Sequence, residues 1–258
     1  MPLYEGLSNG LLACTLNAMG HKYRFAILAM VVVSGAIPSI IPAASAEGQT
    51  NLVIDVARTQ QTIAFKKQSF TSRDCAFVEK MLTGTGKRTL MRFDVTTYNR
   101  GTANLSLGNP VNNTLFEYSP CHNHYHFSNY ALYELFSVDP RISASPSLVT
   151  GRKQAFCLMD TDRDPLAIST NPASFTCSNQ GMSLGWGDTY GAYLDGQWLD
   201  ITRVSPGKYW LRVTVNPLNI NNSGIYSPNS QAALAMLESN YGDNVAVIPV
   251  QIPTRIAG

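Results

Sequence analysis

Histidine and clustered positive charge are both scarce in this sequence. Only four of the 258 residues are histidines. Lysine and arginine together number 19 against 17 acidic residues, and they form no basic stripe. Nucleic-acid-binding proteins use such a stripe to neutralise phosphates, so we expect no nucleic-acid partner. The chain also has no internal repeat and no long low-complexity linker, which favours one compact domain.

The one long apolar run lies near the N-terminus, in a context that favours an export signal. The segment His21–Arg24 supplies positive charge, and the run "FAILAMVVVSGAIPSIIP" follows it and leads to the small residues Ala44–Ala46. This order is typical of a cleaved signal peptide. Pro38 and Pro42 disfavour the alternative, a retained membrane span. We therefore expect residues 1–46 to be an export signal and the chain to have no stable membrane anchor.

Residues 47–258 would then form the exported domain, in a secreted, periplasmic or extracellular location. Met19 is an alternative start for the signal. Without residues 1–46, the chain keeps 17 basic and 16 acidic residues and is long enough for one sizeable core. An even number of cysteines in an oxidising compartment predicts disulfides, with three pairings open. These cysteines are Cys75, Cys121, Cys157 and Cys177.

Short strands dominate the pattern of the exported domain. Runs rich in branched and aromatic residues alternate with turn signals such as "NRGT", "SPGK" and "NPLN". We expect a single all-β, β-sandwich-like domain with long functional loops and little helix. The expected strands are the runs "NLVIDVA", "TLMRFDVTTYN", "ANLSL", "YALYELFSV", "AFCLMD", "WLDITRV", "YWLRVTVN" and "VAVIPVQI".

Three segments add detail to this pattern. Residues 198–204 and 209–215, separated by a Ser-Pro-Gly-Lys turn, predict a hairpin. Ser230–Ser239 is the only segment with a helical pattern. Residues 161–197 have little periodicity, and a loop of that length in a compact domain is usually functional. Its aromatic residues, Trp186 among them, argue against disorder.

Three of the four histidines crowd into the stretch "CHNHYHF". His122, His124 and His126 occupy alternate positions, so in an extended strand they share one face. Three imidazoles on one face repel each other when protonated, and a metal ion relieves this crowding because neutral imidazole is a good ligand. The alternative is a polar strand face without a metal. From these nitrogens alone, zinc and copper suit the site equally well.

Three blocks of the sequence resemble the lysyl oxidase family. The block "CHNHYHF" resembles its copper-binding motif, and "GRKQAFCLMDTDRD" is similar to its segment bearing the cofactor lysine. The block "QGMSLGWGDTYGAYLDGQWLDITRVSPGKYWLRVTVNP" resembles the segment bearing the cofactor tyrosine. The blocks occur in the family's order and cover most of residues 115–217.

The resemblance implies a role for each matched residue. His122, His124 and His126 would bind copper. Copper and dioxygen would oxidise Tyr190 to a quinone, and Lys153 would add to its ring to give lysine tyrosylquinone. A quinone is the electron sink that amine oxidation needs and that no ordinary side chain supplies.

Proton abstraction from the amine also requires a general base. Because the histidines of the exported domain would all be metal ligands, this base should be a carboxylate. Asp188 and Asp195 flank Tyr190 and are our two candidates, although either could instead cap a loop turn.

The chain departs from the animal family members at several positions. Gly187 and Gly196 stand where those members have a pair of cysteines, and Ser119 stands where they have a further histidine. Cys121 and Cys177 match a family disulfide. Arg163 replaces the usual partner of Cys157. That leaves Cys75 and Cys157 as a second bridge or as two free thiols.

The resemblance also implies a structural calcium ion in some family members. The matching positions carry oxygen donors of the type that Ca²⁺ prefers, although a plain acidic loop is the alternative. They are Asn51, Glu238, Asn240, Asp243 and Asn244.

Three functions follow from these residues. The leading interpretation is a secreted copper- and quinone-dependent amine oxidase that acts on peptidyl lysine or other primary amines with dioxygen. It would release aldehyde, ammonia and hydrogen peroxide. The alternatives are a non-catalytic exported copper-binding domain and a zinc hydrolase with three histidines and a water. The zinc hydrolase would leave Lys153 and Tyr190 unexplained. Neither the natural amine nor the oligomeric state follows from the sequence.

Overall fold

The regular structure of the described residues is mostly antiparallel strand with little helix, as expected. The computed structural model describes residues 48–127, 130–152, 156–169, 171–217 and 236–256. One four-stranded sheet has the order β1-β4-β12-β10, and a second has the order β15-β14-β8-β9. The first consists of β1 (Leu52–Ile54), β4 (Val95–Asn99), β12 (Trp186–Tyr190) and β10 (Asp162–Arg163), and the second of β15 (Val245–Ile252), β14 (Gly207–Val215), β8 (Ala131–Phe136) and β9 (Val149–Thr150).

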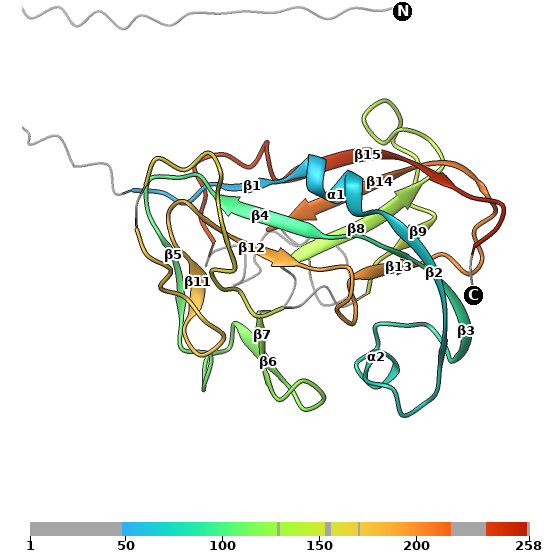
Figure 1. Cartoon of the computed structure of the whole chain (residues 1–258), viewed down its shortest axis with the longest axis horizontal. Helices are drawn as coiled ribbons and strands as arrows, with labels where there is room; N and C mark the ends of the chain where they lie inside the picture. The colour runs from blue at the N-terminus through green and yellow to red at the C-terminus, as the bar shows by residue number, and fades with distance from the viewer. Residues whose placement is uncertain (1–47, 128–129, 153–155, 170, 218–235, 257–258) are drawn as a thin grey trace, which may run out of the picture. The chain divides into compact units, whose positions relative to one another are not determined.

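The two four-stranded sheets enclose the main hydrophobic core, which makes the domain a β-sandwich (Figure 1). Buried side chains of β1 and β4 pack in one cluster with those of β8, β14 and β15. All six residues of β8 and all five of β4 are buried. A strand buried on both faces reads as a nearly continuous apolar run, which is why the sequence predicts β8 well. The single predicted strand "TLMRFDVTTYN" is instead divided between the strand Gly86–Arg92 and β4.

Three smaller sheets flank the sandwich. One has the order β13-β3-β2, and two are strand pairs, β11-β5 and β6-β7. Their members are β2 (Ala64–Phe70), β3 (Gly86–Arg92), β5 (Leu105–Gly108), β6 (Phe116–Ser119), β7 (His124–Phe127), β11 (Gln180–Met182) and β13 (Trp198–Asp200). In Figure 1 the β6-β7 pair and α2 (Cys75–Val78) both lie at the lower edge of the molecule.

The predicted hairpin of residues 198–215 is wrong. β13 pairs with β3, whereas β14 pairs with β8 and β15, so the two strands belong to different sheets. The residues between the two strands do form turns, but a local turn does not determine which strands pair. Leu199 and Leu211 are both fully buried in the main core although their strands lie in different sheets.

Helix is scarce, but its position differs from the prediction. α1 (Val56–Thr62) follows β1, and Asp55 caps it by accepting a hydrogen bond from the Arg58 backbone N–H at 2.9 Å. This cap ends the predicted strand "NLVIDVA" early. Of the predicted helix Ser230–Ser239, residues 230–235 lie outside the described residues, and 236–239 are not helical. Within the described residues, no helix is long and apolar enough to cross a membrane.

Candidate metal centre and cofactor site

Two of the three clustered histidines lie on a strand, and the third does not. His124 and His126 belong to β7, two positions apart, so they share a face. His122 lies in the turn between β6 and β7, where Asn123 adopts a φ of 56° and its N–H donates to the Ser119 carbonyl at 2.8 Å. The expectation of one continuous strand face is therefore right for two histidines and wrong for His122.

The three imidazoles nevertheless converge. One ring nitrogen from each residue lies within 4.8 Å of the others, and Nε2 of His124 lies 2.9 Å from Nε2 of His126. Two imidazoles that bind one metal at about 2.0 Å and at a right angle separate their nitrogens by about 2.8 Å. Burial, together with the neighbouring His122, lowers the pKa of His124 and favours the neutral ring that binds metals. The donor set therefore fits a metal ion.

Two buried polar residues support His122: Glu79, which sequence reasoning missed, and Ser119, which it noted only as a departure from the family. The Glu79 carboxylate lies 3.7 Å from His122 Nδ1 and also accepts the Ser119 hydroxyl hydrogen bond. The Ser119 oxygen in turn accepts the His122 backbone N–H at 3.1 Å. Glu79 immediately follows α2, some 40 positions before Ser119. Nothing in the local sequence pattern links two segments so far apart.

The disulfide pairing implied by the family resemblance is wrong for this structure. Cys121 is bonded to Cys75 and Cys177 to Cys157, with Cα–Cα distances of 5.7 and 5.3 Å. Cys75 is the first residue of α2 and Cys121 lies in the turn between β6 and β7, whereas Cys157 and Cys177 lie on either side of β10. A disulfide requires Cα atoms about 4.4–6.8 Å apart, a condition that only the fold decides. Each bridge contributes about 3–4 kcal/mol of stability in the chain-entropy estimate.

Gly187 and Gly196, the two glycines at the family's cysteine positions, lie where a side chain would collide with neighbouring atoms or strain the backbone. A Cβ on Gly187 would meet the Thr97 carbonyl oxygen at 2.7 Å and would also collide with the Tyr98 ring. Gly196 has a φ of 83°, which side chains rarely adopt. A side chain at position 187 would therefore collide with the neighbouring strand, and one at position 196 would have a strained backbone.

Tyr190 is the last residue of β12 and is buried, with 5% of its surface exposed. Its hydroxyl lies 2.6 Å from the Cys157 carbonyl oxygen and 2.7 Å from Asp188 Oδ2. Its ring packs on Phe156 with the ring centroids 3.9 Å apart. Burial and the charge of Asp188 raise the pKa of this phenol well above its ordinary value. The tyrosine is therefore a neutral, precisely held donor.

Of the two carboxylates that flank Tyr190 in the sequence, Asp188 is the one that contacts it. Asp188 is 2% exposed and also accepts hydrogen bonds from the Met159 backbone N–H at 3.1 Å and the Thr161 hydroxyl at 3.2 Å. Burial raises the pKa of Asp188 to about 7 despite these donors. A carboxyl of this pKa exchanges a proton near neutral pH, as a general base must.

Asp195 lies in the loop after β12, where its charge acts on Arg92. Arg92 holds this loop by donating to the carbonyls of Ala192 and Leu194. In the described part of the chain, no hydrogen bond or ion pair joins Asp195 to Tyr190. Lys153 lies outside the described residues.

Aromatic side chains connect the histidine strand β7 to Tyr190. Phe127, the residue after His126, pairs with Phe156 by two backbone hydrogen bonds. Phe156 in turn packs against Tyr190. Gln180 adds a second link by donating from its side chain to the Tyr125 carbonyl at 2.8 Å. The fold thus brings the second and third matched blocks to the hairpin of β6 and β7 that carries the histidines.

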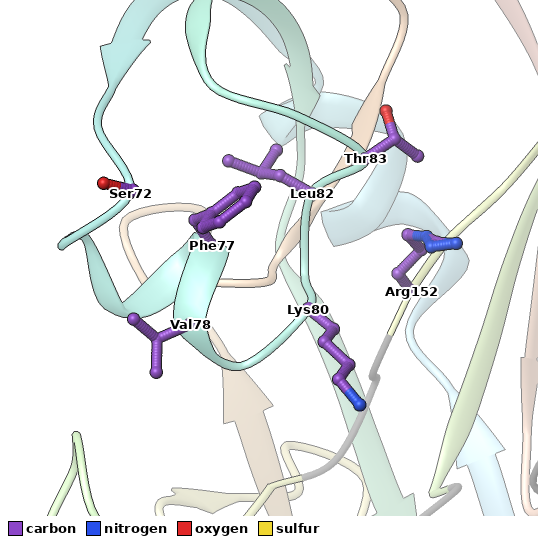
Figure 2. Close-up of a pocket in the computed structure, with 7 residues that line it drawn as sticks. All are labelled: Ser72, Phe77, Val78, Lys80, Leu82, Thr83 and Arg152. Carbon is purple, nitrogen blue, oxygen red and sulfur yellow. The ribbon is translucent and has the colours of Figure 1, made fainter.

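A surface pocket lies beside α2, between that segment and Arg152 (Figure 2). Phe77, Val78 and Leu82 give it an apolar wall, and Lys80 and Arg152 bring two positive charges. The positive charges at this pocket attract an anionic group and repel a protonated amine. Its lining residues are Ser72, Phe77, Val78, Lys80, Leu82, Thr83 and Arg152.

Four of the five residues matched to the calcium site come together. Asn51 donates to Asp243 at 2.9 Å, and Asn244 donates to Glu238 at 2.8 Å. Within the described residues, one buried side-chain oxygen of Asn51, of Asp243 and of Asn244 has no hydrogen-bond partner. Orphaned oxygens of this kind fit a Ca²⁺ ion. Asn240 instead lies exposed and accepts a hydrogen bond from the Gly242 backbone N–H.

Comparison with known proteins agrees with the three sequence blocks. A family model described as lysyl oxidase matches residues 44–246. Protein-lysine 6-oxidase from human is 33% identical over 194 residues, covering 70% of this chain and 44% of the human protein. The pig protein-lysine 6-oxidase is 34% identical over 194 residues, covering 70% of this chain and 74% of the pig protein.

A third relative, human lysyl oxidase homolog 1, is 32% identical over 216 residues, covering 79% of this chain and 33% of that protein. The chain therefore spans less than half the length of either human relative. The family model covers well over half of the 258 residues. This chain belongs to the lysyl oxidase family.

Proposed function

We propose that this protein is a secreted amine oxidase that uses copper and a lysine tyrosylquinone formed from Lys153 and Tyr190. It would convert peptidyl lysine or other primary amines, with dioxygen and water, to aldehyde, ammonia and hydrogen peroxide. The observation that carries the proposal is the convergence of His122, His124 and His126 in a chain of the lysyl oxidase family. The names of the matched relatives, protein-lysine 6-oxidase, support the peptidyl-lysine substrate.

In this proposal the three histidines hold copper through neutral ring nitrogens. When present, copper and dioxygen would supply the oxidation of the tyrosine, and the quinone would accept the electrons of the amine. Tyr190 is held for this by the Cys157 carbonyl and by Asp188. Phe156 covers one face of its ring and excludes water from it.

Asp188 is our candidate for the general base, in preference to Asp195. It contacts the Tyr190 hydroxyl and its pKa of about 7 suits proton transfer at neutral pH. The carboxylate would accept the proton at Oδ2, the oxygen that faces Tyr190. Asp195 has no corresponding contact among the described residues.

The test of the proposed function is oxygen-dependent peroxide release. Mature protein expressed with copper in air is mixed with a lysine-containing peptide, and hydrogen peroxide and aldehyde are measured. Phenylhydrazine, which condenses with quinone carbonyls, should abolish the activity at about one equivalent per chain and give a coloured adduct. Copper binding without peroxide and without the adduct would support the alternative, a non-catalytic copper-binding domain.

The pH dependence of stability gives a prediction for Asp188. Its carboxyl ionises near 3.8 when unfolded and near 7 when folded, so between these values the folded state holds the extra proton. Unfolding then releases a proton, and the stability falls as the pH rises from about 4 to about 7. Across this range, the titration of Asp188 alone should lower the free energy of unfolding by on the order of 4 kcal/mol. Thermal unfolding of copper-free protein across this range measures it.

Asp188→Asn is the matched variant. Asparagine is isosteric and keeps an acceptor for Tyr190 and Met159, so the fold should persist while the titration disappears. We expect stability to depend less on pH from 4 to 7, and amine oxidation by the copper-loaded variant to fall by about 10²–10⁴-fold. Asp195→Asn should change neither. An unchanged pH profile of activity in Asp188→Asn would exclude this residue as the base.

We further propose that Asn51, Glu238, Asp243 and Asn244 bind a structural calcium ion, with Asn240 at the exposed edge. Calcium at about 100 times its dissociation constant should stabilise the fold by about 2.7 kcal/mol. For a domain of this size that is a rise in Tm of roughly 5–10 °C. Asp243→Asn keeps the acceptor for Asn51 but removes the charge, so it should lose most of this rise. An equal rise in the variant would contradict the site.

A further inference from the structure

His122 needs an anchor that the sheet does not provide. The pairing of β7 with β6 fixes His124 opposite Ser119 and His126 opposite Glu117. His122 lies in the turn, outside this register, and its side chain keeps 24% of its surface exposed. Backbone pairing alone therefore fixes only two of the three converging rings.

One buried carboxylate contacts both the ring and, through a serine, the backbone of His122. Glu79 has a side chain 5% exposed, with one oxygen 3.7 Å from His122 Nδ1. Its other oxygen accepts the Ser119 hydroxyl, whose oxygen accepts the His122 N–H at 3.1 Å. These contacts tie one buried carboxylate to both the ring and the backbone of His122.

The position of Glu79 is itself rigid. Its backbone N–H closes the end of α2 by donating to the Cys75 carbonyl at 2.8 Å. The disulfide Cys75–Cys121 joins the start of α2 to the residue next to His122. A second hydrophobic cluster packs this segment on β2, β3 and β13, through Phe70, Ala76, Met81, Leu82, Leu90 and Trp198.

The contact also selects a tautomer. At 3.7 Å the Glu79 carboxylate lies just beyond hydrogen-bond length of Nδ1, and its negative charge favours the form of His122 that carries the proton on Nδ1. The lone pair is then on Nε2, where it is available to a metal. Carboxylate contacts of this kind raise the basicity of a ligating histidine and typically change metal affinity by about 10–100-fold.

We propose that Glu79 is a positioning residue that orients His122 and fixes its Nδ1–H tautomer for copper binding. The inference deepens the proposed function, since it rests on the three histidines being a copper site. Glu79 does not touch copper or substrate; it acts through His122.

The test compares Glu79→Gln with Glu117→Gln in the full mature protein. Glutamine keeps an acceptor for Ser119 but presents an N–H to His122 Nδ1, which favours the opposite tautomer. Glu117→Gln removes a carboxylate at the strand position opposite His126 and is the comparison for the loss of a nearby negative charge. We expect Glu79→Gln to lower copper affinity, measured by chelator competition, by about 10–100-fold and to alter the Cu(II) paramagnetic resonance spectrum. Glu117→Gln should do markedly less.

Equal losses in the two variants would show that only charge matters and would overturn the proposal, as would unchanged affinity in Glu79→Gln. If Glu79→Gln does not fold, the tautomer can be read in wild-type copper-free protein from the nitrogen-15 shifts of His122. A proton on Nδ1 supports the proposal and a proton on Nε2 overturns it. If wild-type protein binds no copper at all, the proposed function fails, but this tautomer measurement still reports on Glu79.

Discussion

Replacing Tyr190 with phenylalanine is expected to abolish amine oxidation, with a fall of at least about 10⁴-fold toward the uncatalysed rate. Phenylalanine lacks the phenol oxygen from which oxidation of the ring must start. Copper should still bind at one ion per chain, because Tyr190 makes no hydrogen bond to a histidine within the described residues. Peroxide release, phenylhydrazine reactivity and copper content separate these effects.

The same substitution should also lower stability moderately. The lost hydroxyl contacts the Cys157 carbonyl at 2.6 Å and Asp188 at 2.7 Å. Leaving such buried acceptors short of a donor costs about 1–3 kcal/mol. Tyr193→Phe is the matched control, since Tyr193 is 83% exposed and lies three positions away. A Tyr190→Phe protein that still oxidises amines would contradict the assignment of the cofactor tyrosine.

Replacing His124 with alanine is expected to have the second large effect, on copper binding and on amine oxidation. It removes one of three converging ligands, so we expect copper affinity to fall by more than the roughly 100-fold typical of outer contacts. Without bound copper, Tyr190 should remain an unmodified tyrosine even in aerated protein, and amine oxidation should be lost. Metal analysis after dialysis and the mass of the Tyr190 peptide measure the two results.

Tyr125→Phe controls for the His124 substitution. Tyr125 lies between His124 and His126 on β7, and its ring packs edge-on against Tyr118 on the neighbouring strand with centroids 5.1 Å apart. It tests whether any change in this strand disturbs the site. Retention of one tightly bound copper per chain in His124→Ala would contradict the three-histidine site.

Local pattern predicted those parts of the structure that local physics determines. The all-β class follows from short apolar runs, and β8 and β14 lie where the runs "YALYELFSV" and "YWLRVTVN" predict them. The convergence of His124 and His126 follows from the two-residue repeat of a strand. These features need no knowledge of which segments meet.

Features that depend on long-range contacts were not predictable in the same way. Two examples are the separate sheets of β13 and β14 and the pairing of Cys121 with Cys75. Both depend on which distant segments the fold brings together. Glu79 reaches His122 across 43 positions of sequence, and no periodicity signals that contact. From the sequence alone, Asp188 and Asp195 were equally good candidates for the general base. The burial of Asp188 against Tyr190 distinguishes them.

Peptide mass mapping would show directly whether Lys153 and Tyr190 become one cofactor. The protein is expressed with copper in air, digested and compared with protein prepared without copper. We expect a cross-linked peptide pair that joins Lys153 to an oxidised Tyr190, only in the copper-loaded sample. Separate and unmodified Lys153 and Tyr190 peptides in fully copper-loaded, aerated protein would contradict it and leave a copper-binding domain without oxidase activity.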